Sequence, residues 1–337
     1  MLRVFAIIAA CFACLAISAF GFGVWFASAP VAERVSTLSQ GETLDVLEEE
    51  AWRSGVHTIL LAGEDDGFGG NDVIMVALLD TTARSLDVLS IPRDTLVDVP
   101  WELKKINSIQ HLYRQLPDEH EHYIYALRDE VAKLIGYPTD HWITLDLNGF
   151  VALVDAIGGI EVDVPRRMAY SDPEQGLWID LQPGLQRLDG TQAMGLVRFR
   201  SYADGDISRM QMQHVFLGAL ADQLLSVRNL LRAHDLAGVF RDHVTTDLSL
   251  RNLAFFASAL MRLEPENIRF HSVDENVANI ADNVNGISYV TLYAEPWTEM
   301  INRYMNPFTF EIVPEDLEIP TWDSQARQFF TTNGALR

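Results

Sequence analysis

Arginines stand in three short segments of this chain, in residue contexts that suit phosphate chemistry. The segments are Ile91-Pro92-Arg93-Asp94, Val197-Arg198-Phe199-Arg200 and Gly205-Asp206-Ile207-Ser208-Arg209. The guanidinium group is a planar fork of donors that matches phosphate oxygens. The chain as a whole is acidic, with 47 Asp and Glu against 25 Lys and Arg in 337 residues. A strongly acidic protein that gathers guanidiniums at a few places is expected to bind an anion there.

An acidic cluster lies upstream of these arginines. Gly63-Glu64-Asp65-Asp66 is followed by a glycine-rich segment that ends at Asn71-Asp72. Carboxylates beside a phosphate site commonly hold a divalent cation. The acidic and basic segments together predict a metal-assisted phosphate site.

Strand signals surround this predicted site. Apolar and β-branched runs predict strands at 58–62, 73–79 and 86–91, the last two joined by a turn at 80–84. If these three strands run as consecutive hairpins, Asp65, Asp72 and Arg93 arrive at the same end of the sheet. Hairpin topology alone would then build half of the site.

Helices and strands alternate after this point. Helices are predicted at 123–135, closed by Gly136 and Pro138, and at 149–157, closed by Gly158-Gly159. Strands are predicted at 142–147, 160–164, 268–273 and 287–292, with a helix that starts after Asp247 or Ser249 and runs to Arg262. The pattern predicts an α/β domain with helices on both faces of a mixed central sheet.

The segment 206–228 predicts a helix that presents polar side chains to an anion. Asp206 suits the N-cap, and Arg209 and Gln213 are four residues apart on one side. Unpaired N–H groups and the helix dipole favour a pyrophosphate at this end. Arg198 and Arg200 are two apart, so they share a side only if that stretch is extended.

The N-terminus predicts a membrane anchor. Val4 to Phe26 is apolar or small throughout, with Arg3 before it, and is long enough for a helix across a bilayer core of about 30 Å. A cleaved signal peptide is the alternative, because Ala27-Ser28-Ala29 resembles a cleavage site, but the apolar run exceeds the roughly 7 to 15 residues of a signal core. We expect an anchor at 1–29, a stalk at 30–55 with a short helical piece around 43–52, an extracytoplasmic domain at 56–305 and a loosely packed tail at 306–337. Both cysteines, Cys11 and Cys14, fall in the anchor.

Composition and other motifs exclude several function classes. A net charge of -22 argues against nucleic acid as the main partner, since the surface would repel a polyanion. The chain has no Gly-x-Ser-x-Gly elbow and no dinucleotide fingerprint at Gly67-Phe68-Gly69-Gly70. Glu119-His120-Glu121-His122 lacks a helical His-x-x-x-His spacing, so a solvated loop is the favoured interpretation.

Eight motifs in one order resemble the LytR-CpsA-Psr family of membrane-anchored enzymes that attach glycopolymers to the cell wall. Besides the two later arginine segments, they are Leu60-Leu61-Ala62-Gly63-Glu64-Asp65, Asn71-Asp72-Val73-Ile74-Met75, Leu89-Ser90-Ile91-Pro92-Arg93-Asp94, Lys105-Ile106-Asn107, Gly149-Phe150-Val151 and Asp155-Ala156-Ile157-Gly158-Gly159-Ile160. The resemblance is strong from about His57 to Leu225 and looser to about Met305.

The resemblance implies a substrate, a reaction and a location. Such proteins sit in the cytoplasmic (inner) membrane with a single span and an outward-facing (periplasmic-side) domain. They transfer a glycan phosphate from a polyprenyl-pyrophosphate carrier to peptidoglycan or another cell-envelope acceptor. Carried over by position, the metal ligands for Mg²⁺, with Mn²⁺ as a substitute, are Asp65 and Asp72. The catalytic arginines are Arg93, Arg198 and Arg200, and the substrate-binding residues are Asp94, Lys105, Asp206, Arg209 and Gln213.

The sequence also departs from the family pattern. Asp66-Gly67 follows Asp65 where the family usually has an arginine, and Met212 replaces a second arginine before Gln213. These losses leave two alternatives open besides transfer: a non-catalytic polyprenyl-phosphate-binding module, and a hydrolase of the lipid pyrophosphate. Retention of both aspartates and four arginines favours an enzyme.

Overall fold

The computed structural model describes residues 51–65, 70–113, 123–173, 177–199, 219, 223, 238–239, 241–260, 262–284, 286–323, 328–332 and 334–335. The predicted anchor and most of the predicted stalk lie outside these residues, as do Arg200, Asp206, Arg209, Gln213 and the segment 119–122. Among the described residues, no helix is long and apolar enough to span a bilayer.

The contacts between Cα atoms divide the described residues into two compact units. The first unit contains residues within 63–67 and 143–261, and the second contains those within 31–62, 68–142 and 262–337. Asp65 and Arg198 therefore belong to the first unit, whereas Asp72, Arg93, Asp94 and Lys105 belong to the second. Each unit is described by itself below.

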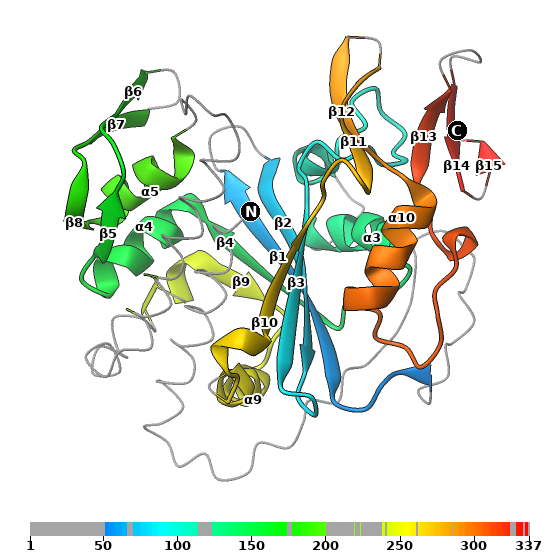
Figure 1. The fold of residues 1–337 in the computed structure, drawn as a ribbon, viewed down its shortest axis with the longest axis horizontal. Coiled ribbons are helices and arrows are strands. Elements are labelled where there is room, and N and C mark those ends of the chain that lie inside the picture. The colour runs from blue at the N-terminus through cyan, green and yellow to red at the C-terminus, as the bar shows by residue number, and fades with distance from the viewer. Residues whose placement is uncertain are drawn as a thin grey trace. The chain divides into compact units, whose positions relative to one another are not determined.

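A six-stranded sheet organises the chain, in the order β10-β3-β2-β1-β4-β9 (Figure 1). The strands are β1 (Val56–Asp65), β2 (Gly70–Asp80), β3 (Ser85–Ile91), β4 (His141–Asp146), β9 (Val244–Thr246) and β10 (Ile268–Ser272). β2 runs antiparallel to β3, and β10 runs parallel to β3, so the sheet is mixed. The predicted mixed α/β fold is confirmed.

Both faces of the central strands are covered. Successive residues of a strand point to opposite faces, yet six consecutive residues of β3, from Leu86 to Ile91, are buried. On one face, Leu60, Ile74 and Leu89 join a core cluster with helix α3. Continuous burial of this kind is the reason that these strands read as apolar runs in the sequence.

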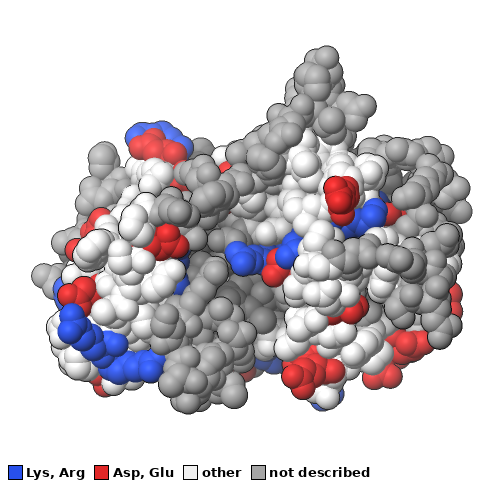
Figure 2. Space-filling model, turned by 90° about the horizontal axis from the view of Figure 1, so that it is seen from above, with Lys and Arg blue, Asp and Glu red and all other residues white. Residues whose placement is uncertain are grey.

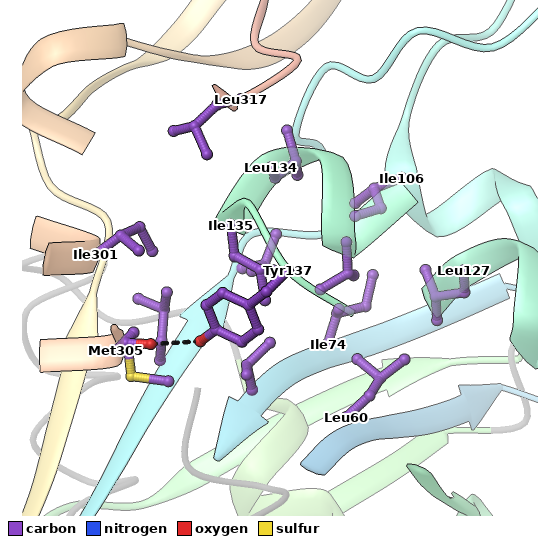
Figure 3. Packing of buried hydrophobic residues seen from close by; sticks show 14 of the residues in the cluster. Leu60, Ile74, Ile106, Leu127, Leu134, Ile135, Tyr137, Ile301, Met305 and Leu317 are labelled. Carbon is purple, nitrogen blue, oxygen red and sulfur yellow. Dashed lines mark hydrogen bonds between the residues drawn. The ribbon is translucent and has the colours of Figure 1, made fainter. Parts of the chain in front are cut away.

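Helix α3 (Ile124–Ile135) and the C-terminal segments form that core (Figure 3). The helix ends as predicted at Gly136, which is left-handed with φ 86°. A Cβ at Gly136 would come within 2.9 Å of Leu317 Cδ2 and would displace the end of that side chain. The buried Tyr137 hydroxyl donates to the Met305 carbonyl oxygen at 2.5 Å, which satisfies the one polar atom of the ring.

The expectation of a loosely packed tail is wrong for the residues after 306 that the structure describes. Phe308, Ile312, Leu317 and Ile319 are at most 4% exposed and belong to the core cluster of the second unit. Trp52, at the end of the predicted stalk, is also buried and forms an isolated bridge with Phe308. These buried residues occur singly and at irregular spacing. The sequence around them therefore has no periodic pattern that would predict their burial.

The second unit holds further elements around its strands. They are η2 (Ile106–Ser108), α2 (Ile109–Tyr113), η3 (Pro265–Asn267), β11 (Ala278–Val284), β12 (Ile287–Leu292), α10 (Ala294–Met300), the π-helix η4 (Ile301–Met305), η5 (Pro314–Asp316), β13 (Pro320–Asp323), β14 (Gln328–Thr331) and β15 (Gly334–Ala335). The strands predicted near 268–273 and 287–292 are confirmed as β10 and β12.

The described part of the first unit contains three further helices, two of which pack together, and two antiparallel two-stranded sheets. Its remaining elements are α4 (Leu147–Ala156), β5 (Ile160–Val164), β6 (Met168–Asp172), β7 (Leu177–Leu181), β8 (Gly184–Leu188), α5 (Gly190–Arg198) and α9 (Leu250–Leu260). α4 begins two residues earlier than predicted because the Asp146 side chain accepts a hydrogen bond from the Gly149 amide and caps the helix. The helix predicted at 206–228 lies outside the described residues, apart from Ala219 and Gln223.

Candidate functional site

The Arg93 segment is a tight turn at the end of β3. The Thr95 amide and hydroxyl both donate to the Pro92 carbonyl oxygen, at 3.0 and 2.7 Å. The paired register of β2 and β3 ends at Ile74 and Ile91. Asp72 precedes Ile74 by two residues and Arg93 follows Ile91 by two, so both residues lie at the same end of the hairpin. This part of the sequence prediction is confirmed.

Asp94 and Lys105 form the best-defined ion pair of the predicted site. Lys105 Nζ lies 2.8 Å from Asp94 Oδ1, and Arg93 Nε lies 3.9 Å from Asp94 Oδ2. Their side chains are partly exposed, 19% for Lys105, 39% for Arg93 and 37% for Asp94. One carboxylate thus stands between two cations, and the three groups carry a net charge of +1.

Backbone hydrogen bonds hold this group in place from two sides. The Asp94 carbonyl oxygen accepts from the Val290 amide of β12 at 2.9 Å, and Lys105 Nζ lies 5.8 Å from the centre of the Tyr289 ring. On the other side, the Asn107 amide of η2 donates to the Arg93 carbonyl oxygen at 3.2 Å. The cations therefore sit on a fixed backbone, which lowers the cost of ordering them around a ligand.

The start of β2 lies against η2. A Cβ on Gly70 would come within 2.9 Å of the Asn107 carbonyl oxygen, so only glycine allows this approach. Gly70, the last glycine of the glycine-rich segment, therefore allows β2 to pack closely on η2. Through Asn107, the same contact connects the start of β2 to the Arg93 turn.

Asn71 is a residue of this region that the sequence did not single out as a ligand. Its side chain is fully buried, and neither Nδ2 nor Oδ1 has a hydrogen-bond partner among the residues that the structure describes. A buried, unsatisfied amide costs about 1–3 kcal/mol, so such groups commonly mark an ion, a water or a ligand. Sequence context gave no signal for it, because burial of a polar side chain is a property of the tertiary structure.

Asp72 carries a ligand type that suits a hard divalent cation. Mg²⁺ accepts carboxylates, and it usually needs only one or two of them from the protein beside phosphate and water. Asn71 precedes Asp72 in β2, and successive positions of a strand lie on opposite faces, so the buried Asn71 amide is not on the face of position 72. Asp65, the other predicted ligand, is the last residue of β1 in the first unit. The described part of the chain contains no group of three or more His, Cys, Asp or Glu side chains placed to hold a metal.

Arg198 ends a well-capped helix in the first unit. Helix α5 begins with a capping box between Asp189 and Gln192, and Arg198 is its last residue. Phe199 then turns to the extended conformation, with φ -63° and ψ 126°. Arg198 and Arg200 would share a side only if the backbone were extended at both residues. Arg198 is the last residue of a helix, so this condition is not met there.

Charges are distributed in small groups on the face drawn in Figure 2. Lys and Arg atoms lie there in separate clusters, several of them next to Asp or Glu atoms, and grey atoms cover much of the rest. Where the structure describes this face, positive charge is local and partly neutralised. Such a distribution suits a compact anion better than a long polyanion.

The family comparison agrees with the motif order. The model of the LytR_cpsA_psr family matches residues 29–305. The chain therefore belongs to the LytR_cpsA_psr family.

Curated relatives match about half of the chain. A Corynebacterium glutamicum protein described as probable cell wall biosynthesis protein LcpB is 36% identical over 170 residues, 50% of this chain and 38% of that protein. Bacillus subtilis TagV, described as a polyisoprenyl-teichoic acid–peptidoglycan teichoic acid transferase, is 29% identical over 192 residues, 54% of this chain and 46% of TagV. The matched region thus spans less than half the length of these two relatives.

Solved structures share the fold. The crystal structure of B. subtilis TagV superposes with a TM-score of 0.56 at 24% identity, covering 73% of this chain and 94% of that one. The Streptococcus agalactiae protein gbs0355 gives a TM-score of 0.58 at 18% identity, covering 77% and 93%. At these identities the likeness establishes the fold alone.

Proposed function

We propose that this protein is a membrane-anchored phosphotransferase of the cell envelope. It moves a glycan phosphate from a polyprenyl-pyrophosphate carrier to a cell-wall acceptor such as peptidoglycan. Support comes from the family membership and from the name of the relative TagV, which describes the same class of donor and acceptor. The apolar segment Val4–Phe26 would hold the protein in the cytoplasmic membrane with its domain on the outer side.

The observation that carries the proposal is the Arg93–Asp94–Lys105 group at the end of β3. Phosphoryl transfer needs charge neutralisation of the phosphate oxygens and a positioned acceptor more than covalent help from the protein. Arg93 can present a guanidinium fork, and Lys105 a second positive charge. Hydrogen bonds hold the backbone that carries both cations before the ligand arrives.

Asp94 has a positioning role in this proposal. Its carboxylate would repel a phosphate, but it accepts the Lys105 ammonium at 2.8 Å and so sets the direction of that charge. Arg198, Arg200, Arg209 and Gln213 would add further donors to the pyrophosphate, with Asp206 as the N-cap of the predicted helix that carries Arg209 and Gln213. These assignments rest on the family motif.

The metal is part of the proposal as well. Asp65 and Asp72 would hold Mg²⁺ or Mn²⁺, and the bound ion would neutralise charge on the pyrophosphate. The residues around it then bind and orient the donor, and the arginines stabilise the charge that builds on the leaving phosphate.

The test uses the full-length protein in detergent with a polyprenyl-pyrophosphoryl glycan labelled in the sugar. We expect label to become covalently attached to peptidoglycan in wild type. Arg93→Ala or Arg198→Ala should abolish attachment with a nearly unchanged thermal melt, whereas Arg251→Ala, an exposed arginine of α9, should keep it. Full activity of Arg93→Ala would overturn the site assignment.

The same assay separates the two alternatives. Release of labelled glycan phosphate to water without attachment would identify a lipid-pyrophosphate hydrolase. Donor binding without turnover, in the presence of metal and acceptor, would identify a non-catalytic binding module.

A further inference from the structure

The β6–β7 hairpin of the first unit has one buried and one exposed face. β6 and β7 pair antiparallel, with Met168 opposite Leu181 and Ser171 opposite Trp178. Met168, Ile179 and Leu181 are at most 3% exposed and form the inner face. Ser171, Trp178 and Asp180 lie on the outer face, because facing residues and residues two apart share a side.

Trp178 is the most exposed large apolar side chain among the described residues, at 76%. Its strand is nevertheless firmly seated, since Ile179 packs toward helix α5. A Cβ on Gly195 of that helix would lie 3.3 Å from Ile179. A rigid strand thus presents an indole ring to solvent, and no described neighbour covers it.

Hydrogen-bonded polar groups stand beside the ring on the same face. Arg167 donates to Asp180 Oδ1 from Nε at 3.3 Å and from Nη2 at 3.2 Å. Gln182 Nε2 donates to the same oxygen at 3.2 Å. The guanidinium, carboxylate and amide form one polar row, and the opposite charges of Arg167 and Asp180 cancel.

We propose that this outer face is a docking site for neutral glycan strands, with one sugar ring stacked on Trp178. A pyranose has an apolar face of C–H groups, which matches an indole, and an edge of hydroxyls that both donate and accept. The Arg167–Asp180–Gln182 row offers donors and acceptors to that edge. Its cancelled charge favours an uncharged polysaccharide over a phosphate polymer or an anionic lipid surface.

The hairpin packs on a helix of the first unit that ends at a predicted phosphate-binding arginine. Helix α5 contacts β7 through Gly195 and ends one turn later at Arg198. A glycan on the outer face of β7 would therefore be held on a strand that packs against the helix carrying a predicted phosphate-binding arginine. The inference rests on the proposed function and assigns this face to the acceptor.

Binding to purified, polymer-free peptidoglycan sacculi tests the inference with the full-length chain in detergent. Trp178→Ala should weaken binding about tenfold, and Trp178→Tyr should keep most of it, because the aromatic face remains. Leu185→Ala removes an apolar side chain that is 70% exposed on neighbouring β8 and should leave binding unchanged. Soluble N-acetylglucosamine oligosaccharides should compete with sacculi for wild type.

Four outcomes decide the matter. Unchanged binding of Trp178→Ala, or an equal loss in Leu185→Ala, would overturn the inference. Quenching of Trp178 by brominated lipids in nanodiscs, measured against Trp178→Phe, would place the ring in a bilayer and overturn it as well. A higher KM for the acceptor in Trp178→Ala at unchanged kcat would support it.

Arg93→Ala keeps the two proposals apart. This variant should lose transfer yet bind sacculi like wild type. If wild type shows no transfer but binds sacculi through Trp178, the proposed function fails and the glycan site stands. If transfer occurs with a Trp178-independent acceptor KM, the glycan site fails and the proposed function stands.

Discussion

Lys105 Nζ contacts Asp94 Oδ1 at 2.8 Å, while the backbone of Asp94 is fixed to Val290 of β12. The ion pair therefore joins the Arg93 turn, the segment before η2 and a strand that is almost 200 residues further along the chain. The pair is partly exposed, so its contribution to folding stability is small. Its value lies in holding a positive charge at the end of the β2–β3 hairpin.

Breaking this pair should affect turnover more than folding. We expect Asp94→Asn and Lys105→Met each to lower the rate of transfer, and the double variant to lose less than the sum of the two. Groups in direct contact typically couple by about 0.5–3 kcal/mol. A double-mutant cycle on kcat/KM measures the coupling, and strictly additive losses would show that the two residues act independently.

Asp72→Asn should remove the dependence of activity on Mg²⁺. An amide cannot supply the charge that a hard cation favours, and Asp65→Asn should behave in the same way. Asp80→Asn, at the opposite end of β2, is the matched control and should keep the wild-type titration with Mg²⁺. Unaltered metal titration of the Asp72 and Asp65 variants would mean that these acids are ordinary loop and strand-end residues.

Asp87 should make the fold sensitive to acid. Burial raises the pKa of this carboxyl, but hydrogen bonds from His271 and Arg269 outweigh it, and the pKa ends below its usual value of 3.8. The stabilisation is therefore present above about pH 3.8 and is lost as the pH falls through the lower pKa of the folded state. His271 also stacks on Tyr304 at 3.9 Å, so the same group joins β3, β10 and η4.

Asp87→Asn should destabilise the protein at neutral pH by about 2–3 kcal/mol, the scale of lost hydrogen bonds to a buried charge. Its thermal melt should then depend less on pH below 4 than that of wild type. Asp163→Asn, an exposed acid on β5, should follow the wild-type profile. A wild-type acid profile in Asp87→Asn would exclude this carboxyl as the sensitive group.

Glu130 should make the stability of the fold fall as the pH rises, which is opposite to the effect of Asp87 and occurs at higher pH. Burial in α3 raises its pKa to about 7, although Lys133 Nζ at 2.6 Å partly offsets this. A raised pKa means that its stabilisation is complete below the unfolded value of 4.5 and is lost as the pH rises to about 7. The loss amounts to about 3 kcal/mol at most, from 1.36 kcal/mol per pKa unit.

Glu130→Gln should therefore flatten the fall in melting temperature between pH 4.5 and 7. Chemical denaturation at pH 4.5, 6 and 8 measures the free energy of unfolding directly. Glu299→Gln, exposed on α10, serves as the control and should show the wild-type slope. A steeper slope in Glu130→Gln would contradict the assignment.

The anchor makes a separate prediction about location. If Val4–Phe26 is retained in the membrane, the native protein should fractionate with the inner membrane, and protease added to spheroplasts should digest the domain. Polyprenyl carriers present their glycans on that side, so the domain must stay within reach. Recovery of a soluble mature protein that begins at Pro30 would show signal cleavage instead.

The sequence by itself determined the central strands and the segments that carry the candidate site. Continuous apolar runs placed β1, β2 and β3 within a few residues of their observed bounds, and the short turn between β2 and β3 fixed their antiparallel pairing. Asp72 and Arg93 then had to share one end of the hairpin. Local signals sufficed here because neighbouring strands pair through a short loop.

Only the tertiary structure decided which distant segments complete these elements. Periodicity shows which side of a strand is buried, but not which segment covers it, so the parallel pairing of β10 with β3 gave no local signal. The same holds for the Val290 contact of Asp94 and for the buried tail residues Phe308 and Leu317. Asn71 and Trp178 are the clearest cases. The fold buries the Asn71 amide without a partner among the described residues and leaves the Trp178 indole in solvent, because burial depends on the packing of the whole chain.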